Sequence, residues 1–143
     1  MKAISIRQPW AWAILHAGKR IENRGWSTRH RGPILLHVSA GLTKREYQEF
    51  QLFLATLPQE MQKSVPSLPP MAALPRGGIV GRANLVDVLD YTKDTPPSGQ
   101  AEWFFGPYGF LLDDVREVPF VPYRGELSLF NVPAELAGGP VYG

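Results

Sequence analysis

ISIRQPWAWAILHAGKRIENRGWSTRHRGPILLHVS, residues 4–39, holds most of the chemically distinctive side chains of this 143-residue chain. Three of the four tryptophans and all three histidines lie in it. Glu22 is the only acidic residue among the first 45 positions, which carry nine lysines and arginines. A lone carboxylate inside the basic segment GKRIENR (18–24) indicates a charge with a specific task. The rest of the chain then serves as the scaffold for this stretch.

The composition indicates a single globular domain over residues 1–143. Hydrophobic residues make up 44% of the chain, which is enough for a substantial core. Cysteine is absent, so disulfides and thiol chemistry are excluded, and a reducing compartment fits best. No apolar run reaches the roughly 20 residues that cross a bilayer, and the polar start of the chain is unlike a signal peptide. We therefore expect a cytoplasmic protein without a membrane partner.

The net charge of +2 conceals an uneven distribution. Residues 1–45 carry a net charge of +8, whereas the remainder has six basic and twelve acidic side chains. Such asymmetry favours a surface that attracts polyanions, nucleic acid first among them. The alternative is that the folded surface mixes the two signs.

The front of the chain predicts two strands separated by a short helix. Residues 2–7 alternate apolar and polar side chains, as a half-buried strand does. Residues 8–18 predict a helix, with Pro9 in the first turn and Gly18 just past the end. Residues 33–39, PILLHVS, predict the second strand.

The remainder predicts another helix and a series of strands. Thr43 and Glu46 form a capping box that opens a helix over 43–57. Five prolines between 58 and 78 predict a surface loop at 58–77, which would act as a lid or be a simple insertion. Further strands are expected at 77–91 (with a bulge or close backbone approach at Gly81), 108–115, 117–123 and 125–133, followed by a mobile tail at 137–143. These elements predict a small, curled α+β barrel.

Lys19, Glu22 and Arg24 are the first candidate site. If residues 21–24 form a strand, Glu22 and Arg24 point to the same side, and the guanidinium orients the carboxylate. An oriented carboxylate can accept a hydrogen bond from an exocyclic amine, such as N4 of cytosine. Lys19 would contact phosphate or, if buried, act as a base. The alternative is a structural ion-pair cluster that ties the helix to the strand.

Gln8 and the tryptophans extend this candidate site. Gln8 can read a base edge, and Trp10 can stack under a base unless it belongs to the core. Trp26 lies in a polar, arginine-rich turn, where a core role is less natural. Arginines next to an aromatic side chain are typical of single-strand binding, and the candidates for phosphate contacts are Arg7, Arg20, Arg29 and Arg31.

Other kinds of site fit the sequence less well. The spacing of His16, His30 and His37 matches no metal-ligand pattern, so we expect no metal site. His37 and Ser39 share a strand face, where histidine can activate serine, although a satisfied core histidine is the commoner case. The segment RGGIVGR (76–82) lacks the spacing and the lysine of a phosphate-binding loop. We expect no cofactor.

The stretch quoted above resembles the front half of bacterial or phage ASCH-domain proteins (activating signal cointegrator homology), of the PUA-like superfamily. Lys19, Glu22 and Arg24 match the family motif GxKxxExR, although Ala17 stands at its glycine. IVGRANLVDVL (79–89) and GELSLFNVP (125–133) resemble the closing strands of the family. The resemblance implies a PUA-like pseudo β-barrel of about five to seven mixed strands, with two main helices near the N-terminal half.

The resemblance also implies RNA or a modified nucleoside as the partner, bound where the first helix meets the sheet. Some family members are amidohydrolases on N4-acylcytidine, and others are reported to cleave RNA. The amidohydrolases have a nucleophilic threonine three positions after the lysine, where this chain has Glu22. Their mechanism therefore does not carry over directly, although Lys19 and Glu22 would still be able to activate a water. A module that docks a protein through residues 58–77 is the third alternative.

Overall fold

The computed structural model describes residues 1–136. The predicted mobile tail at 137–143 lies outside the described residues. Three helices are present: α1 (Trp10–His16), α2 (Lys44–Thr56) and α3 (Gln59–Ser64). One sheet has the strand order β2-β5-β4-β3-β1-β6. Its strands are β1 (Lys2–Ile6), β2 (Ile21–Arg24), β3 (Gly32–Val38), β4 (Gly78–Asp90), β5 (Tyr108–Pro122) and β6 (Leu129–Asn131).

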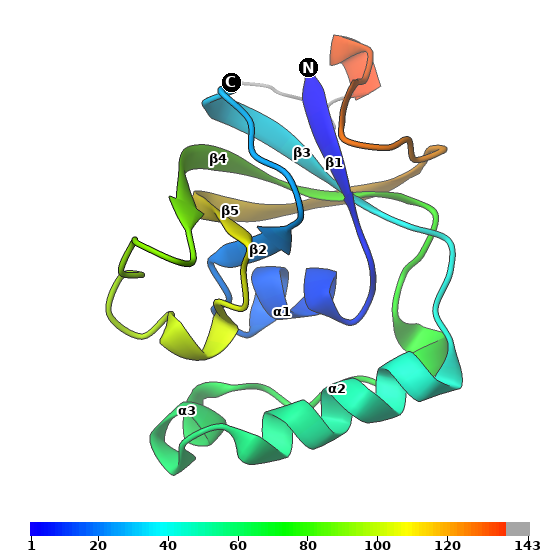
Figure 1. Ribbon diagram of the computed structural model, residues 1–143. Coiled ribbons are helices and arrows are strands. Elements are labelled where there is room, and N and C mark those ends of the chain that lie inside the picture. The colour runs from blue at the N-terminus through cyan, green and yellow to red at the C-terminus, as the bar shows by residue number, and fades with distance from the viewer. Residues whose placement is uncertain (137–143) are drawn as a thin grey trace.

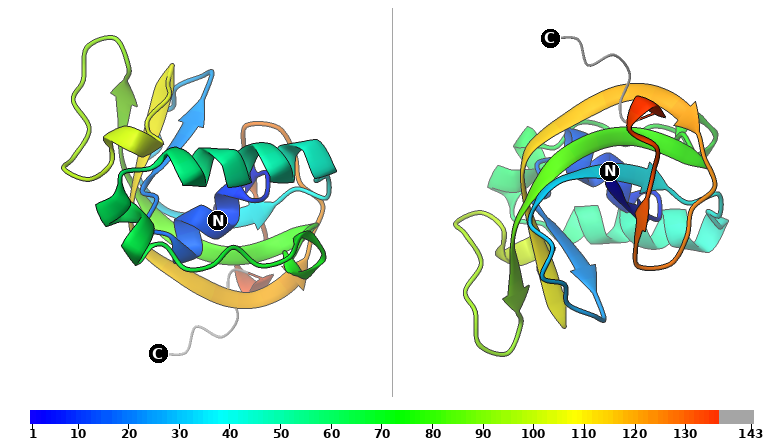
Figure 2. Two further views of the ribbon diagram at one scale, coloured as in Figure 1. Left: turned by 90° about the horizontal axis from the view of Figure 1, so that it is seen from below. Right: turned by 90° about the horizontal axis from the view of Figure 1, so that it is seen from above.

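The sheet curls over α1, and α2 covers the other side of that helix (Figures 1 and 2). β1 runs parallel to β3, whereas the other neighbours pair antiparallel, so the sheet is mixed. This architecture confirms the predicted α+β class with a curled, barrel-like sheet. The number of strands also falls within the predicted range.

Helix α1 is short but buried on two sides. Ile14 packs with Leu36 and Phe110 in the core between α1 and the sheet. Trp12 packs with Phe50 of α2 in a second core between the two helices. A seven-residue helix is marginal in isolation, so this burial on both sides is what holds α1 in place. The predicted capping box of α2 is present, with Glu46 N–H donating to Thr43 and Thr43 N–H donating to the Glu46 carboxylate.

The two strands predicted at 108–115 and 117–123 form one continuous strand, β5. Proline interrupts a strand ladder because it lacks an N–H, and this is why the sequence predicts two strands. In the structure, Pro119 falls where three residues of β5 oppose one residue of β4, between the pairs Ile79↔Val121 and Gly81↔Glu117. Because the regular ladder is interrupted at this bulge, proline is tolerated there despite its missing N–H. Gly81 lies at the same bulge, where a Cβ atom would be 2.8 Å from the Arg116 carbonyl oxygen, so the predicted close backbone approach is confirmed.

The proline-rich segment 58–77 is only partly loop, because it includes α3 and a 3-10 turn at Met71–Ala73. Leu74, near its end, is buried with Trp12 and Phe50 in the core between the helices. Both the start and the end of the segment are thereby fixed to the domain. Within the described part of the chain, no helix combines the length and the apolarity needed to span a membrane.

Candidate functional site

Lys19, Glu22 and Arg24 form one hydrogen-bonded cluster at the start of β2. The Lys19 side chain is only 1% exposed, and its ammonium donates to the Ile21 carbonyl and to Glu22 Oε1 at 3.3 Å. Arg24 Nε and Nη2 lie 3.2 and 3.1 Å from Glu22 Oε2. Each carboxylate oxygen of Glu22 therefore has its own cationic partner, and the carboxylate is fixed in one orientation.

The end of α1 brings Lys19 into this position. Gly18 has a φ of +80°, the left-handed conformation typical of the residue that follows a helix. The turn allows Lys19 N–H to donate to the Ala13 carbonyl, and it places the ammonium 5.7 Å from the ring centroid of Trp10. Burial lowers the pKa of the Lys19 ammonium below its ordinary value, and Glu22 opposes this shift only in part.

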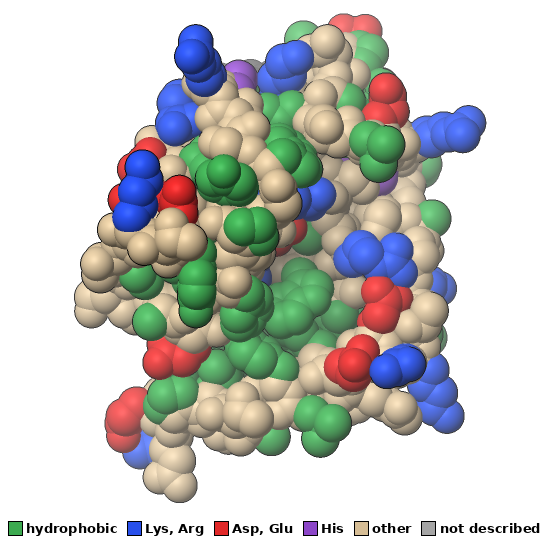
Figure 3. Space-filling view, viewed as in Figure 1, with side chains coloured by type: hydrophobic (Ala, Val, Ile, Leu, Met, Phe, Trp, Pro, Cys, Tyr) green, Lys and Arg blue, Asp and Glu red, His purple; other side chains and the backbone are tan. Residues whose placement is uncertain are grey.

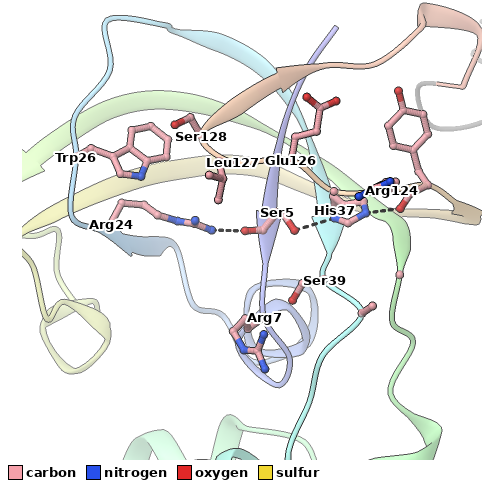
Figure 4. Close-up of a pocket in the computed structure, with 14 residues that line it drawn as sticks. Ser5, Arg7, Arg24, Trp26, His37, Ser39, Arg124, Glu126, Leu127 and Ser128 are labelled. Atoms are coloured by element: carbon pink, nitrogen blue, oxygen red, sulfur yellow. Dashed lines mark hydrogen bonds between the residues drawn. The ribbon is translucent and has the colours of Figure 1, made fainter.

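A chain of hydrogen bonds continues from this cluster across β1 and β3 (Figure 4). Arg24 Nη2 donates to the Ser5 carbonyl, and the Ser5 hydroxyl lies 2.9 Å from His37 Nδ1. His37 Nε2 lies 2.6 Å from the Tyr123 carbonyl. Because a carbonyl only accepts, Nε2 carries the hydrogen, and in the neutral ring Nδ1 accepts from Ser5. The buried cluster is thus connected to the loop after β5.

Two adjoining depressions flank Arg24, and together they form a cleft. The narrow compartment, of about 410 Å³, is lined by Ser5, Ile6, Arg7, Trp10, Glu22, Asn23, Arg24, Gly25 and Trp26. The wide compartment, of about 990 Å³, shares Ser5, Arg7, Arg24 and Trp26 with it and continues to His37, Ser39, Ala40, Gly77 and residues 123–128. Figure 3 shows the molecule hollowed between α2 and the sheet, with apolar side chains on the floor and both basic and acidic side chains around the rim.

Two tryptophans, Trp10 and Trp26, line the narrow compartment, and further aromatic rings pack behind Trp10. Trp10 packs edge-on against Phe50 and Phe105, with centroid distances of 4.9 and 5.7 Å. Asn23 holds the segment that carries Phe105, because its side-chain oxygen accepts from Phe105 N–H and its amide donates to the Trp103 carbonyl. Phe105 remains 47% exposed. Trp10 is therefore at once a core residue and a wall residue, so the two predicted roles are not exclusive.

Trp26 lines both compartments. It also packs perpendicular to the buried Phe110, at a centroid distance of 5.1 Å. The expectation that a core role is less natural for Trp26 is therefore only partly right, because one contact of the ring belongs to the core and the ring also faces the cleft.

Gln8 and Arg20 lie away from both compartments. The side chain of Gln8 is buried, accepts from Trp12 N–H and donates to the Pro75 carbonyl at 3.0 Å. Arg20 donates to the carbonyls of Ile14 and Lys19 at the end of α1, and burial lowers the pKa of its guanidinium. Both residues hold the helix rather than face the cleft.

Arg29 and Arg31 follow β2 on the turn to β3. Arg31 donates to the carbonyls of Thr28 and His30 and lies 3.5 Å from an Asp87 carboxylate oxygen. Arg29 is exposed, and residues 1–136 offer it no hydrogen bond or ion pair. Neither side chain lines the two compartments described above.

Arg7 lines both compartments and also pairs with α2. Its Nε and Nη2 each donate to a different Glu46 carboxylate oxygen at 2.6 Å. This bidentate contact lowers the pKa of Glu46 to about 2, with further support from the Thr43 cap, and it raises the pKa of Arg7. Arg7 is therefore held at the mouth of the cleft.

Sequence reasoning missed Ser5 and Arg124. For His37 it considered Ser39 as a partner but favoured a satisfied core histidine, and the structure shows a buried histidine bonded to Ser5 and to the Tyr123 carbonyl. The ring of His37 pairs with Ser5 because β1 and β3 are parallel neighbours with Ser5 directly opposite His37. That register would have been needed to find the pair from the sequence. Arg124 lies in the turn after β5, and no pattern in the sequence marks it. In the described part of the chain no three His, Asp or Glu side chains come together in a way that would hold a metal ion.

Comparisons with known proteins identify the family of the chain. The profile of the ASCH domain matches residues 4–118. The chain is also 28% identical over 140 residues to human activating signal cointegrator 1. The alignment covers 95% of this chain but only 23% of that protein, so the chain corresponds to less than a quarter of this relative. The matched region contains α1, the Lys19–Glu22–Arg24 cluster, strands β2 to β4 and most of β1 and β5, and the chain belongs to the ASCH domain family.

Proposed function

We propose that the chain binds RNA, or a modified nucleoside within it, with one base in the narrow compartment. The observation that carries this proposal is the orientation of Glu22. Glu22 is 8% exposed, has a cation beside each carboxylate oxygen and still lines the compartment. Each oxygen has a second lone pair, so Glu22 can accept a hydrogen bond from an exocyclic amine such as N4 of cytosine.

The surroundings of Glu22 suit a nucleotide. Trp10 and Trp26 provide aromatic surface on which a base can stack. Arg24 and Arg7 lie on the same wall, where a phosphate would approach. Arg29, exposed on the turn after β2, would extend the basic approach, whereas Gln8 and Arg20 would support the site by holding α1.

A hydrolase that acts on a modified base or RNA is the second candidate function. The observation in its favour is the buried Lys19, whose lowered pKa and contact with Glu22 resemble the tuning of catalytic groups. In an N4-acylcytidine amidohydrolase reaction, Glu22 would take a proton from water as the oxygen attacks the acyl carbon, and that proton would pass to the departing N4 amine. Lys19 lies behind Glu22 and would act as a positioning residue.

The test is incubation of the purified protein with free nucleosides, N4-acylated cytidine and a short single-stranded RNA, followed by chromatography. Binding without turnover would appear as salt-sensitive retention of the RNA, because phosphate contacts release counterions. New products that vanish in Glu22→Gln would instead identify an enzyme. Glu22→Gln should abolish turnover and leave affinity for the RNA backbone nearly intact in the enzyme case. Loss of binding in this variant would make Glu22 a recognition group.

Glu22→Gln leaves Lys19 buried beside a neutral side chain, so a second variant separates folding from function. Phe105→Ala removes an exposed ring that packs behind Trp10 and leaves the charged cluster intact. The proposal expects weaker RNA retention in this variant, because Trp10 loses a packing partner, with unchanged far-UV circular dichroism. Retention that is indifferent to Phe105→Ala and independent of salt would contradict the proposal.

A further inference from the structure

We infer that the wide compartment is a subsite for a second nucleotide, so that the ligand is a single strand of at least two ribonucleotides rather than a free nucleoside. The inference rests on the proposed function of the narrow compartment. It assigns a ligand class to the wide compartment, namely the second nucleotide of an RNA strand together with the phosphate that joins it to the first.

The first observation is that the two compartments share one wall. Arg24 and Trp26 line both of them, and Figure 4 shows both side chains at the same end of the wide compartment. The volumes, about 410 and 990 Å³, each fall within the range of small-molecule sites. A chain that places a base in the narrow compartment therefore passes Arg24 as it leaves, which is where the next phosphate would lie.

The second observation is the charge around the wide compartment. Arg7, Arg24 and Arg124 line it, with Glu126 as the acidic exception. Arg124 is exposed and has no ion-pair partner among the described residues, in contrast to Arg7 and Arg24, which pair with glutamates. An arginine without such a partner can contact a phosphate without first giving up an ion pair.

The third observation is an unused hydroxyl. Ser39 lines the wide compartment, whereas its Oγ is turned away from solvent and has no hydrogen-bond partner in the described part of the chain. Buried polar atoms are nearly always paired in native proteins, so this hydroxyl indicates a missing partner. A ribose hydroxyl or a phosphate oxygen would supply it when the Ser39 side chain rotates toward the compartment.

The fourth observation is that the far wall is held in place. The Tyr123 carbonyl accepts from His37, which ties the segment 123–128 to β3. Gly125 lies over the Ser5–His37 pair, and a Cβ atom there would be 2.7 Å from His37 Cε1. The compartment is therefore a preformed surface, and binding in it requires little ordering of the loop.

The test compares cytidine, cytidine 3′-monophosphate and the dinucleotide CpC by calorimetry, with an eight-nucleotide oligocytidylate as a reference for binding. The inference expects CpC to bind at least about fivefold more tightly than cytidine 3′-monophosphate, since one stacked base contributes that much or more. Arg124→Gln should weaken binding of the octamer and lower its salt dependence by about 0.7 in log–log slope, as the loss of one phosphate contact to a single strand does. Affinity for cytidine itself should not change.

The matched control is Arg45→Gln, which removes an exposed arginine of α2 outside both compartments. Ser39→Ala is a second probe, because it removes the hydroxyl without removing charge, and it should weaken CpC but not cytidine. Equal affinities of CpC and cytidine 3′-monophosphate, with the octamer still bound, would overturn the second subsite and leave the proposed function standing. Failure of every probe, the octamer included, would overturn both.

Discussion

Glu22 and Glu46 are both paired with arginine, but Glu22 lies in the interior and Glu46 at the surface. Glu22 lies between Arg24 and the buried Lys19, in a cluster whose lysine is only 1% exposed. Glu46 pairs with Arg7, and these side chains are 32% and 47% exposed. The surface pair has the better geometry, with two contacts of 2.6 Å. Exposure, rather than distance, separates what the two contacts do.

In the interior, a charge that loses its partner cannot return to water, so the cluster is stable only as a unit. At the surface, water and salt replace the partner at little free-energy cost. Glu22 therefore keeps one orientation, as recognition of a base edge requires. Arg7 is able to exchange Glu46 for a ligand phosphate.

The largest effect should come from neutralising Glu22. Glu22→Gln leaves the ammonium of Lys19 buried without its counter-charge, and breaking a buried pair in this way costs about 3–5 kcal/mol. Urea unfolding followed by tryptophan fluorescence measures the change. A loss below about 1 kcal/mol would show that Lys19 reaches solvent or deprotonates at little cost, contrary to the buried geometry.

A double variant sharpens this first prediction. Lys19→Met combined with Glu22→Gln removes both charges while keeping similar side-chain volumes. Because the unpaired buried charge is then absent, the double variant should recover most of the stability that Glu22→Gln loses. Additive losses in the two single variants and the double variant would mean that the side chains do not act as a unit.

An intermediate effect is expected one step along the chain of hydrogen bonds. Ser5→Ala removes the donor to His37 Nδ1, a buried acceptor, and should cost about 1–3 kcal/mol in urea unfolding. Ser39→Ala is the matched control in the same compartment, because its hydroxyl has no partner among the described residues. The control should be neutral or slightly stabilising. Equal losses in the two variants would contradict the assigned hydrogen bond.

The same contrast explains what the sequence could predict. Local patterns gave the strand at 2–7, the first helix, the capping box of α2 and the bulge at Gly81, because each depends on residues close together in the chain. The cluster of Lys19, Glu22 and Arg24 was found for the same reason, since all three lie within six positions. The continuous β5 was missed, because only the bulge that β5 forms opposite β4 makes Pro119 acceptable there.

Contacts between distant segments were beyond these patterns. Ser5 meets His37 through the parallel pairing of β1 and β3, and Tyr123 joins them from the end of β5. The assignment of Arg20 to the nucleic-acid surface used its charge alone, whereas the structure uses its guanidinium to cap the carbonyls at the end of α1. Composition identifies a basic region, but the fold decides which arginines face the cleft.

A small effect is expected at the surface pair. Arg7→Gln removes the contact with Glu46 while the capping box of α2 stays intact, and exposed pairs contribute about 0.2–1 kcal/mol. The loss should shrink further in 1 M salt, where screening acts over only about 3 Å. Urea unfolding at low and high salt measures both changes. A loss that exceeds 1 kcal/mol and is insensitive to salt would place this pair with the buried cluster.

The smallest effect is the acid dependence of that surface contribution. Arg7 holds the pKa of Glu46 at about 2 in the folded state, below its ordinary value of 4.5. Because the folded-state pKa is depressed, the folded state binds fewer protons, and the contribution is fully present above pH 4.5 and lost as the pH falls toward 2. The difference in unfolding free energy between the wild type and Arg7→Gln should therefore decline through this range. A difference that stays constant from pH 6 to pH 2 would show that Arg7 stabilises the protein through packing rather than through the charge of Glu46.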